Sequence, residues 1–139
     1  MTTKTAVIDS QSIADEFLDW VRVEAHSLGF APCLATVLYR PAADPASIRY
    51  RDLISKDGAR LGLKVRAVEA ADETELRASI DALNRDPSVH GVVVFYPLRC
   101  KVSDEDVMDR VSPFKDAEGL HSINLGYLIK YKIFVDEAK

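Results

Sequence analysis

Two runs of apolar residues along the chain predict strands that are buried on both faces. The first covers residues 33–39, and the second covers 90–97, where a glycine is followed by three valines and a phenylalanine. Continuous apolar runs of this length are typical of strands inside a parallel sheet, because helices cover both faces of such sheets. The segment at 63–68 alternates apolar with charged residues instead, which predicts an edge strand with one wet face.

Apolar residues at helical spacing predict four helices around these strands. Each predicted helix begins at a side chain that can accept hydrogen bonds from free backbone N–H groups: Asp9 or Ser10, Asp44, Asp72 and Ser103. We expect the first helix to end at Gly29, the second at about Leu61 and the short fourth helix at Pro113. The first and third helices should each bury one face, made respectively by Ile13, Phe17, Trp20, Val21 and Leu28 and by Leu76, Ile80 and Leu83.

The order of these elements, helix, strand, helix, strand, helix, strand, helix, predicts an α/β fold. Right-handed crossovers place helices on both faces of a small parallel sheet, so we expect three αβα layers. The two apolar strands should lie inside this sheet. A chain of 139 residues suits a single domain with its own core, and no internal repeat divides it. Residues 127–135 are apolar enough to be ordered, and 136–139 form a polar tail.

The composition excludes several classes of function. A formal net charge of −4, without a cluster of Lys and Arg, argues against a nucleic-acid partner. No apolar run approaches the ~20 residues that cross a bilayer, and the polar N-terminus does not resemble a secretory signal. We therefore expect no membrane partner and a cytoplasmic location. The two cysteines and three histidines show no spacing typical of a disulfide framework or a metal site.

The end of the 90–97 strand is the first candidate site. Ligands of open parallel sheets bind outside the carboxyl ends of the strands. There Tyr96, Pro97 and Leu98 could form an apolar floor for a flat ligand. The residues alone equally allow a plain core strand followed by a turn. Taken singly, Tyr50 is more typical of helix packing, and Glu118 is more typical of a solvated loop.

Four segments, taken together and in order, resemble the N-terminal, folate-binding domain of the methylenetetrahydrofolate dehydrogenase/cyclohydrolase family. They are Pro-Cys-Leu-Ala at 32–35, Asp-Pro-Ala-Ser at 44–47 with Tyr50, Leu-Asn-Arg-Asp at 83–86 with the strand at 91–98, and Lys-Asp-Ala-Glu-Gly-Leu at 115–120 with Asn124 and Gly126. They cover most of the chain between residues 30 and 128, at nearly the family's spacing.

Three positions depart from the family's pattern. The bifunctional enzymes carry a lysine four residues after the tyrosine that faces folate, but Ile54 follows Tyr50 at that distance. Their glutamine before the Leu-Pro-Leu-Pro segment is Phe95 here, and the last aspartate of their Lys-Asp-Val-Asp-Gly motif is Glu118. This combination looks most like the monofunctional NAD-dependent methylenetetrahydrofolate dehydrogenases known from yeast.

The resemblance implies an oxidoreductase that transfers a hydride from methylenetetrahydrofolate to NAD or NADP, giving methenyltetrahydrofolate. It implies Tyr50 and Glu118 as the catalytic residues, with Tyr50 stacked on a folate ring and Glu118 accepting hydrogen bonds from the pterin. The substrate slot would be lined by Ser47, Tyr50, Ile54, Phe95, Tyr96, Pro97, Leu98 and Glu118. Cyclohydrolase activity is expected to be absent, because isoleucine and phenylalanine cannot carry a proton.

In the family the chain continues into a Rossmann domain, whereas no glycine-rich phosphate-binding turn follows a strand here. The isolated domain is therefore expected to be inactive, either as a piece of a longer enzyme or as a free-standing folate-binding half. Two alternatives stay open: a non-catalytic folate-binding or assembly module with the same fold, and an unrelated small α/β domain that matches by chance. The choice between NAD and NADP, and any homodimer of the full-length protein, would depend on the other half.

Overall fold

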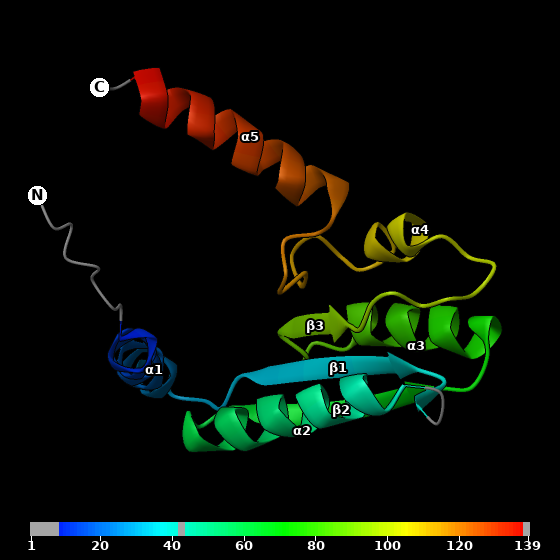
Figure 1. The fold of residues 1–139 in the computed structure, drawn as a ribbon, viewed down its shortest axis with the longest axis horizontal. Coiled ribbons are helices and arrows are strands. Elements are labelled where there is room, and N and C mark those ends of the chain that lie inside the picture. Colours follow the sequence, from blue (N-terminus) through cyan, green and yellow to red (C-terminus); the bar gives the residue numbers. More distant parts are fainter. Residues whose placement is uncertain (1–8, 42–43, 138–139) are drawn as a thin grey trace, which may run out of the picture.

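The computed structural model describes residues 9–41 and 44–137, with side chains described as far as residue 130. Its centre is a parallel sheet of three strands in the order β2-β1-β3 (Figure 1). Strand β1 (Cys33–Tyr39) lies in the middle, between β2 (Lys64–Ala70) and β3 (Gly91–Val94). The inner position of β1 and the edge position of β2 confirm the predictions for residues 33–39 and 63–68.

Two long helices cover the opposite faces of this sheet. Helix α2 (Pro45–Arg60) connects β1 to β2, and α3 (Glu73–Arg85) connects β2 to β3 (Figure 1). Helix α1 (Ser10–Ser27) precedes β1, the short α4 (Asp104–Met108) follows β3, and α5 (Ser122–Glu137) comes last. The arrangement is the three-layer αβα fold expected from the order of the elements.

The first four helices begin where the sequence predicts. The side chains of Asp9, Asp44, Asp72 and Ser103 each accept a hydrogen bond from a backbone N–H group in the first turn of the helix that follows. These bonds satisfy donors that have no partner within the helix, and each cap contributes about 1 kcal/mol. The start of each helix is therefore a local property of the sequence.

The main core lies between the sheet and α3. Leu76, Ile80 and Leu83 of α3 are buried, which confirms its predicted apolar stripe. They pack with the strand residues that point to the same face and with the segment after β3: Ala35, Val37, Val92, Val94, Leu98, Val107 and Val111. Full burial of such side chains contributes roughly 1.5–3 kcal/mol each. This cluster therefore fixes α3 and the segment after β3 on one face of the sheet.

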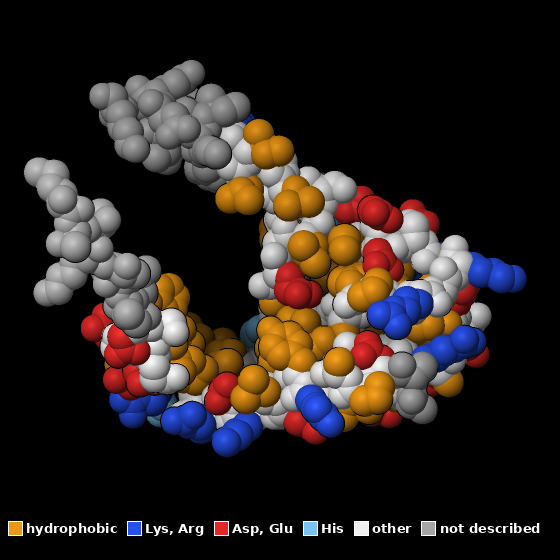
Figure 2. Space-filling view, in the orientation of Figure 1, with side chains coloured by type: hydrophobic (Ala, Val, Ile, Leu, Met, Phe, Trp, Pro, Cys, Tyr) orange, Lys and Arg blue, Asp and Glu red, His pale blue; other side chains and the backbone are white. Residues whose placement is uncertain are grey.

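The prediction that α1 buries one face is wrong for the described structure. Along its apolar stripe Ile13 is 56% exposed, Phe17 65% and Trp20 58%, and Ala25 is the residue that this helix buries. Figure 2 shows hydrophobic side chains of α1 along one side of a hollow that separates this helix from the part of the domain below α5. Helical spacing shows that one face of a helix is apolar, but it does not show whether another part of the protein covers that face.

Helix α5 extends away from the sheet (Figure 1), and its described side chains are exposed except that of Asn124, which is half-buried. It contains the segment at 127–135 that was expected to be ordered, and residues 138–139 of the expected tail lie outside the described residues. Its exposed apolar side chains are Ile123, Leu125, Tyr127, Leu128 and Ile129. None of the described helices combines the length and the apolarity needed to cross a bilayer.

Strand β3 lies at an edge of the described sheet, which contradicts the prediction that it lies inside. A short piece of chain, rather than another strand, covers its outer edge. The N–H of Val92 donates to the carbonyl of Lys115 (2.6 Å), and the carbonyl of Val92 accepts from the N–H of Ala117 (3.3 Å). An apolar run shows that both faces of a strand are buried, but it does not show what pairs with its edges.

Gly58 lies buried in α2, where a Cβ atom would stand 2.6 Å from Cγ2 of Val65 on β2. We expect Gly58→Ala to destabilise the fold by about 1–3 kcal/mol, because overpacking outweighs a gain in helix propensity of about 1 kcal/mol. Urea unfolding followed by circular dichroism measures the change. Gly126→Ala in α5 is the matched control, since nothing described lies within 4 Å of its added Cβ. A Gly58→Ala variant as stable as the wild type would contradict this expectation.

Candidate functional site

The ring of Tyr50 on α2 meets the ring of Phe95 at the end of β3. Their centroids lie 5.8 Å apart and their planes cross at 87°, an edge-to-face contact. Phe95 is 9% exposed, whereas Tyr50 is 57% exposed. The N–H of Phe95 donates to the carbonyl of Val37 (3.1 Å), which ties it to the middle strand. A rigid, buried ring thus supports a phenol ring that remains available to a ligand.

Ser47 and Ile54 lie about one turn to either side of Tyr50 on α2. The hydroxyl and the N–H of Ser47 donate to the Asp44 carboxylate at 2.6 and 3.2 Å. These bonds, the hydroxyl first, hold the pKa of Asp44 below its ordinary value. The Ser47 side chain is therefore committed to the start of α2, and Ile54 is half-buried against the body of the domain.

The chain turns sharply after Phe95. The peptide bond between Tyr96 and Pro97 is cis. Leu98 is 5% exposed and belongs to the main core, while its N–H donates to the carboxylate of Asp104 (3.1 Å) at the start of α4. Of the three residues predicted to form a floor, Tyr96 is half-buried, Pro97 faces solvent, and Leu98 faces the core.

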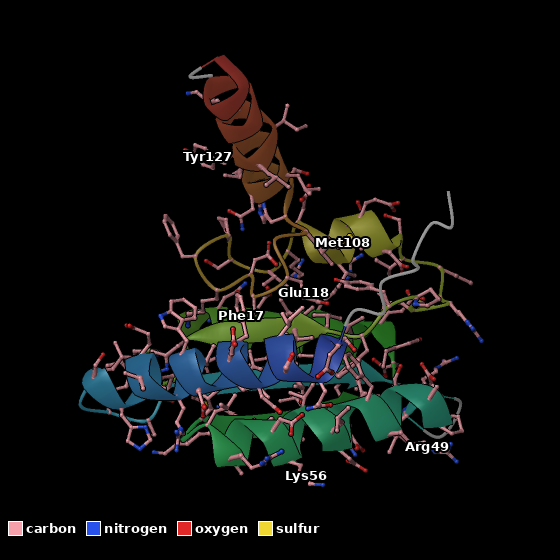
Figure 3. All side chains as sticks on the ribbon, turned by 60° about the vertical axis from the view of Figure 1, so that its left-hand side comes forward. Phe17, Arg49, Lys56, Met108, Glu118 and Tyr127 are labelled. Atoms are coloured by element: carbon pink, nitrogen blue, oxygen red, sulfur yellow. The ribbon has the colours of Figure 1, made fainter. Side chains whose placement is uncertain are left out.

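Glu118 stands on the loop that covers the edge of β3. The bridge between Val92 and Asp116 is parallel, so Glu118, two residues further on, comes beside Val94. There the backbone N–H of Val94 faces the Glu118 carboxylate and favours its ionised form. Figure 3 shows Glu118 between β3 and the loops that follow it. The backbone pairing of the sheet thus places this carboxylate, although its residue is far from β3 in the sequence.

Burial and neighbouring charge set the protonation of this corner of the molecule. Partial burial raises the pKa of Glu118, the charge of Asp116 raises it further, and the N–H of Val94 acts in the opposite sense. Burial also raises the pKa of the Tyr96 phenol far above its ordinary value, with added repulsion from Glu118, Asp104 and Asp116. The phenol therefore stays neutral and can donate a hydrogen bond beside a carboxylate that can accept them.

The structure gathers four of the predicted site residues into two adjoining pairs. Tyr50 pairs with Phe95, and Tyr96 lies within the electrostatic influence of Glu118. The remaining predicted residues, Ser47, Ile54, Pro97 and Leu98, surround these pairs without joining either of them by a described contact.

Sequence reasoning gave no role to Lys115 or Asp116, although both hold the loop that carries Glu118. The Asp116 carboxylate accepts hydrogen bonds from the backbone N–H groups of Glu118, Gly119 and His121 and from the Asn124 side chain. The sequence signal for such a loop is an aspartate three residues before a glycine, because aspartate caps its own turn and glycine adopts positive φ. Gly119 has φ +71°.

A cavity of about 610 Å³ lies elsewhere, between α1 and the end of α2. None of the predicted site residues lines it. Much of its lining consists of charged side chains: Asp15, Asp19, Arg22, Asp57 and Arg60. Within residues 9–41 and 44–137, no group of three His, Cys, Asp or Glu side chains is placed to hold a metal ion. The candidate site lies apart from this cavity, at the end of β3.

We expect Glu118→Gln to stabilise the fold at pH 7 and to leave it unchanged at about pH 3. The pKa of Glu118 is higher in the folded state than its ordinary value, so ionisation lowers stability as the pH rises through that interval. Below the ordinary carboxyl pKa of about 4.3 both states are protonated and the difference vanishes. Urea unfolding midpoints at the two pH values measure this.

Glu16→Gln is the control for charge alone, because Glu16 is exposed on α1, away from the end of β3. Equal midpoints for Glu118→Gln and the wild type at pH 7 would contradict a raised pKa.

The chain is similar in sequence to a well-defined family. Residues 8–118 match the family described as tetrahydrofolate dehydrogenase/cyclohydrolase, catalytic domain. The bifunctional protein FolD of Heliobacterium modesticaldum is 38% identical over 128 residues, which are 88% of this chain and 44% of that protein. The chain thus spans about half the length of the curated relatives it matches.

Solved structures give the same result. The Trypanosoma brucei N5,N10-methylenetetrahydrofolate dehydrogenase-cyclohydrolase (FolD), complexed with NADP cofactor and inhibitor, matches 91% of this chain and 45% of its own, with TM-score 0.81 and 25% identity. The NAD-dependent 5,10-methylenetetrahydrofolate dehydrogenase of Saccharomyces cerevisiae matches 81% and 36%, with TM-score 0.74 and 25% identity. The chain therefore belongs to the tetrahydrofolate dehydrogenase/cyclohydrolase family, of which it carries the N-terminal, catalytic domain.

Proposed function

We propose that this chain is the substrate-binding domain of a cytoplasmic oxidoreductase that transfers a hydride from methylenetetrahydrofolate to a nicotinamide cofactor, giving methenyltetrahydrofolate. The observation that carries the proposal is the exposed ring of Tyr50 held against Phe95 at the end of β3, in a chain of this family whose Glu118 stands on the loop that pairs with the same strand. In this reaction the protein must orient two flat rings and exclude water.

Tyr50 would provide the platform for a ring of the folate. Its ring is 57% exposed and is held at one side by Phe95, so it can stack on a flat ligand with little loss of side-chain freedom. Ile54, one turn further along α2, would add an apolar side to the slot. Such a ring contact contributes about 0.5–1.5 kcal/mol beyond the burial of its area.

Glu118 would select the pterin. A carboxylate has about four acceptor positions, of which the Val94 N–H would take one. The others match the amino group and the adjacent ring N–H of a pterin, which form a fork of two parallel donors. Tyr96 would donate to an acceptor of the same ring system, because its phenol keeps its proton. Glu118 would thus recognise the donor edge of the ligand, and Tyr96 would recognise an acceptor on it.

The absence of cyclohydrolase activity belongs to the same proposal. Addition of water to the methenyl carbon requires a group that moves protons, and at two family positions this chain has Ile54 and Phe95, which cannot do so. Tyr96 does not replace them, because a phenol whose pKa is raised gives no base at neutral pH. The methenyl product would therefore leave without enzyme-catalysed hydrolysis.

The carboxyl ends of the three described strands do not fit a dinucleotide. The turns after β1, β2 and β3 contain no glycine, whereas a dinucleotide-binding turn needs glycines so that the pyrophosphate can approach a helix N-terminus. Carboxylates of Asp44 and Asp72 cap α2 and α3, and negative caps repel phosphate. NAD or NADP would then bind mainly to another part of a longer protein, which would also carry any homodimer contact. The 139 residues alone would be inactive.

A second candidate is a non-catalytic folate-binding or assembly module. Isoleucine at 54 and phenylalanine at 95 favour it, because neither side chain can carry a proton. The aspartate-capped helices favour it as well, because they oppose binding of a phosphate group but leave the slot for folate in place. The two functions differ in one measurable property: a module binds tetrahydrofolate but does not oxidise methylenetetrahydrofolate in any native chain that contains it.

Tetrahydrofolate binding to the 139-residue chain, followed by quenching of the single tryptophan, tests the slot. We expect Glu118→Ala to raise the Kd about 10- to 100-fold, because hydrogen bonds to a charged group contribute roughly 1.5–3 kcal/mol. Tyr50→Ala should raise it about 2- to 10-fold through the lost ring contact. Tyr127→Ala, a tyrosine 54% exposed on α5, is the matched control. Unchanged affinities in both site variants would disprove the proposed slot.

The longest native chain, assayed with NAD and with NADP, tests the reaction. We expect oxidation of methylenetetrahydrofolate with one of the two cofactors, and hydrolysis of methenyltetrahydrofolate at the spontaneous rate, because no side chain at 54 or 95 moves a proton. Binding without oxidation would favour the non-catalytic module. Hydrolysis well above the spontaneous rate would refute the monofunctional assignment.

A further inference from the structure

We propose that Asp116 is a positioning residue, whose carboxylate holds the turn at residues 115–121, named here the Asp116 turn, so that Glu118 faces the end of β3. Asp116 would act through Glu118, so its role rests on the proposed function, although the geometry that supports it involves no ligand. Asp116 itself would make no contact with the substrate. Asp116 would thus position the turn, and Glu118, two residues later, would bind the substrate.

The hydrogen bonds of Asp116 leave it no capacity for a ligand. One carboxylate oxygen accepts from the N–H groups of Glu118 (3.3 Å) and Gly119 (3.0 Å). The other accepts from the N–H of His121 (2.9 Å) and from Nδ2 of Asn124 (2.9 Å). Four donors fill the acceptor positions of a carboxylate. Every backbone donor among them belongs to the Asp116 turn, so the path of that turn follows this one side chain.

Lys115 fastens the same turn to two rigid elements. Its ammonium group donates to the carbonyls of Leu83 (2.9 Å) and Asp86 (2.6 Å) at the end of α3, where the helix dipole favours a positive charge. Its own carbonyl accepts from Val92 of β3 (2.6 Å). The turn is therefore anchored on a helix terminus and on a strand, the kind of support that fixes a side chain to within a fraction of an ångström.

The charge of Asp116 also acts on Glu118. Burial opposes the ionisation of Asp116, but the hydrogen bonds from Asn124 and from backbone N–H groups outweigh this and lower the pKa of Asp116. It is therefore a fixed negative charge beside Glu118, which also faces the Val94 N–H and, from the end of β3, the neutral Tyr96. Neutralising Asp116 should thus lower the pKa of Glu118, a result that support of the fold alone would not produce.

The test compares Asp116→Asn with Asp109→Asn in the 139-residue chain. Asp109 is the control because its carboxylate also accepts a backbone N–H and a hydroxyl, both from Ser122 at the start of α5, at 2.8 and 2.7 Å. Its contact with the Asp116 turn is an approach of His121 Nδ1 at 3.8 Å, without a hydrogen bond to the backbone of the turn. Carboxyl NMR titration gives the pKa of Glu118, and tryptophan quenching gives the Kd of tetrahydrofolate. We expect Asp116→Asn to lower that pKa and raise the Kd about 10-fold or more, since a displacement of ~1 Å at a binding group can cost ~100-fold.

Gly119→Ala separates geometry from charge, because it strains a turn residue with φ +71° and keeps both carboxylates. It should raise the Kd while the pKa of Glu118 changes less than in Asp116→Asn. If Asp116→Asn does not fold, Gly119→Ala still tests the positioning role of Asp116. A Gly119→Ala chain that binds tetrahydrofolate as tightly as the wild type would overturn that role.

Two other results would overturn it. One is a Glu118 titration unaffected by Asp116→Asn, and the other is an equal loss of affinity in Asp109→Asn. If Glu118→Gln binds tetrahydrofolate as the wild type does, or if the wild type does not bind it, the proposed function fails. The NMR titration, which needs no ligand, would still decide the role of Asp116.

Discussion

Strand β3 lies at the edge of a three-stranded sheet, and an edge strand presents backbone N–H and C=O groups that need partners. Here the segment at 115–117 meets that need through two hydrogen bonds to Val92. Because the pairing is parallel, it also determines which residue comes next to Val94, and that residue is Glu118. The most important carboxylate of the candidate site is thus placed by the completion of a sheet edge.

Around this edge, similar chemical groups have different properties because their surroundings differ. Asp116 receives four hydrogen bonds and stays ionised, whereas Glu118 is partly buried beside that negative charge and has a raised pKa. Tyr96 is half-buried among carboxylates and keeps its proton, but Tyr50 is open to solvent on α2. A phenol that donates, a carboxylate that accepts and an exposed ring held by Phe95 therefore stand around the end of β3 before a ligand binds.

The apolar surfaces of the molecule agree with the proposed place of this domain in a longer protein. Helix α1 exposes Phe17 and Trp20, and α5 exposes Leu128 and Ile129, although soluble domains rarely leave contiguous apolar surfaces of this kind uncovered. The curated relatives that match the chain are about twice as long. A further part of such a protein that packed against these helices would also exclude water from the open slot at the end of β3.

The sequence by itself determined the three strands and the first four helices of this protein and most of its layers, whereas helix α5 became known only from the structure. Asp44 and Asp72 define helix starts because capping is local, and Leu76 and Ile80 mark a buried stripe because their spacing matches the helix period. The ordered motifs around Tyr50 and Glu118 identified the family because each motif has a fixed distance from the next. These are properties of a single chain segment, or of distances along the chain.

Only the tertiary structure decided what lies beside each element. The run at 91–94 looks like an inner strand, yet β3 lies at an edge, because apolar faces say nothing about lateral pairing. The stripe of α1 predicts burial, yet Phe17 is exposed, because the covering surface is not encoded in the helix itself. Leu98 points into the core, and Val92 pairs with the segment at 115–117, through contacts with residues brought near by folding. The physical reason is the same in each case: periodicity and capping depend on near neighbours, whereas packing and pairing depend on the whole fold.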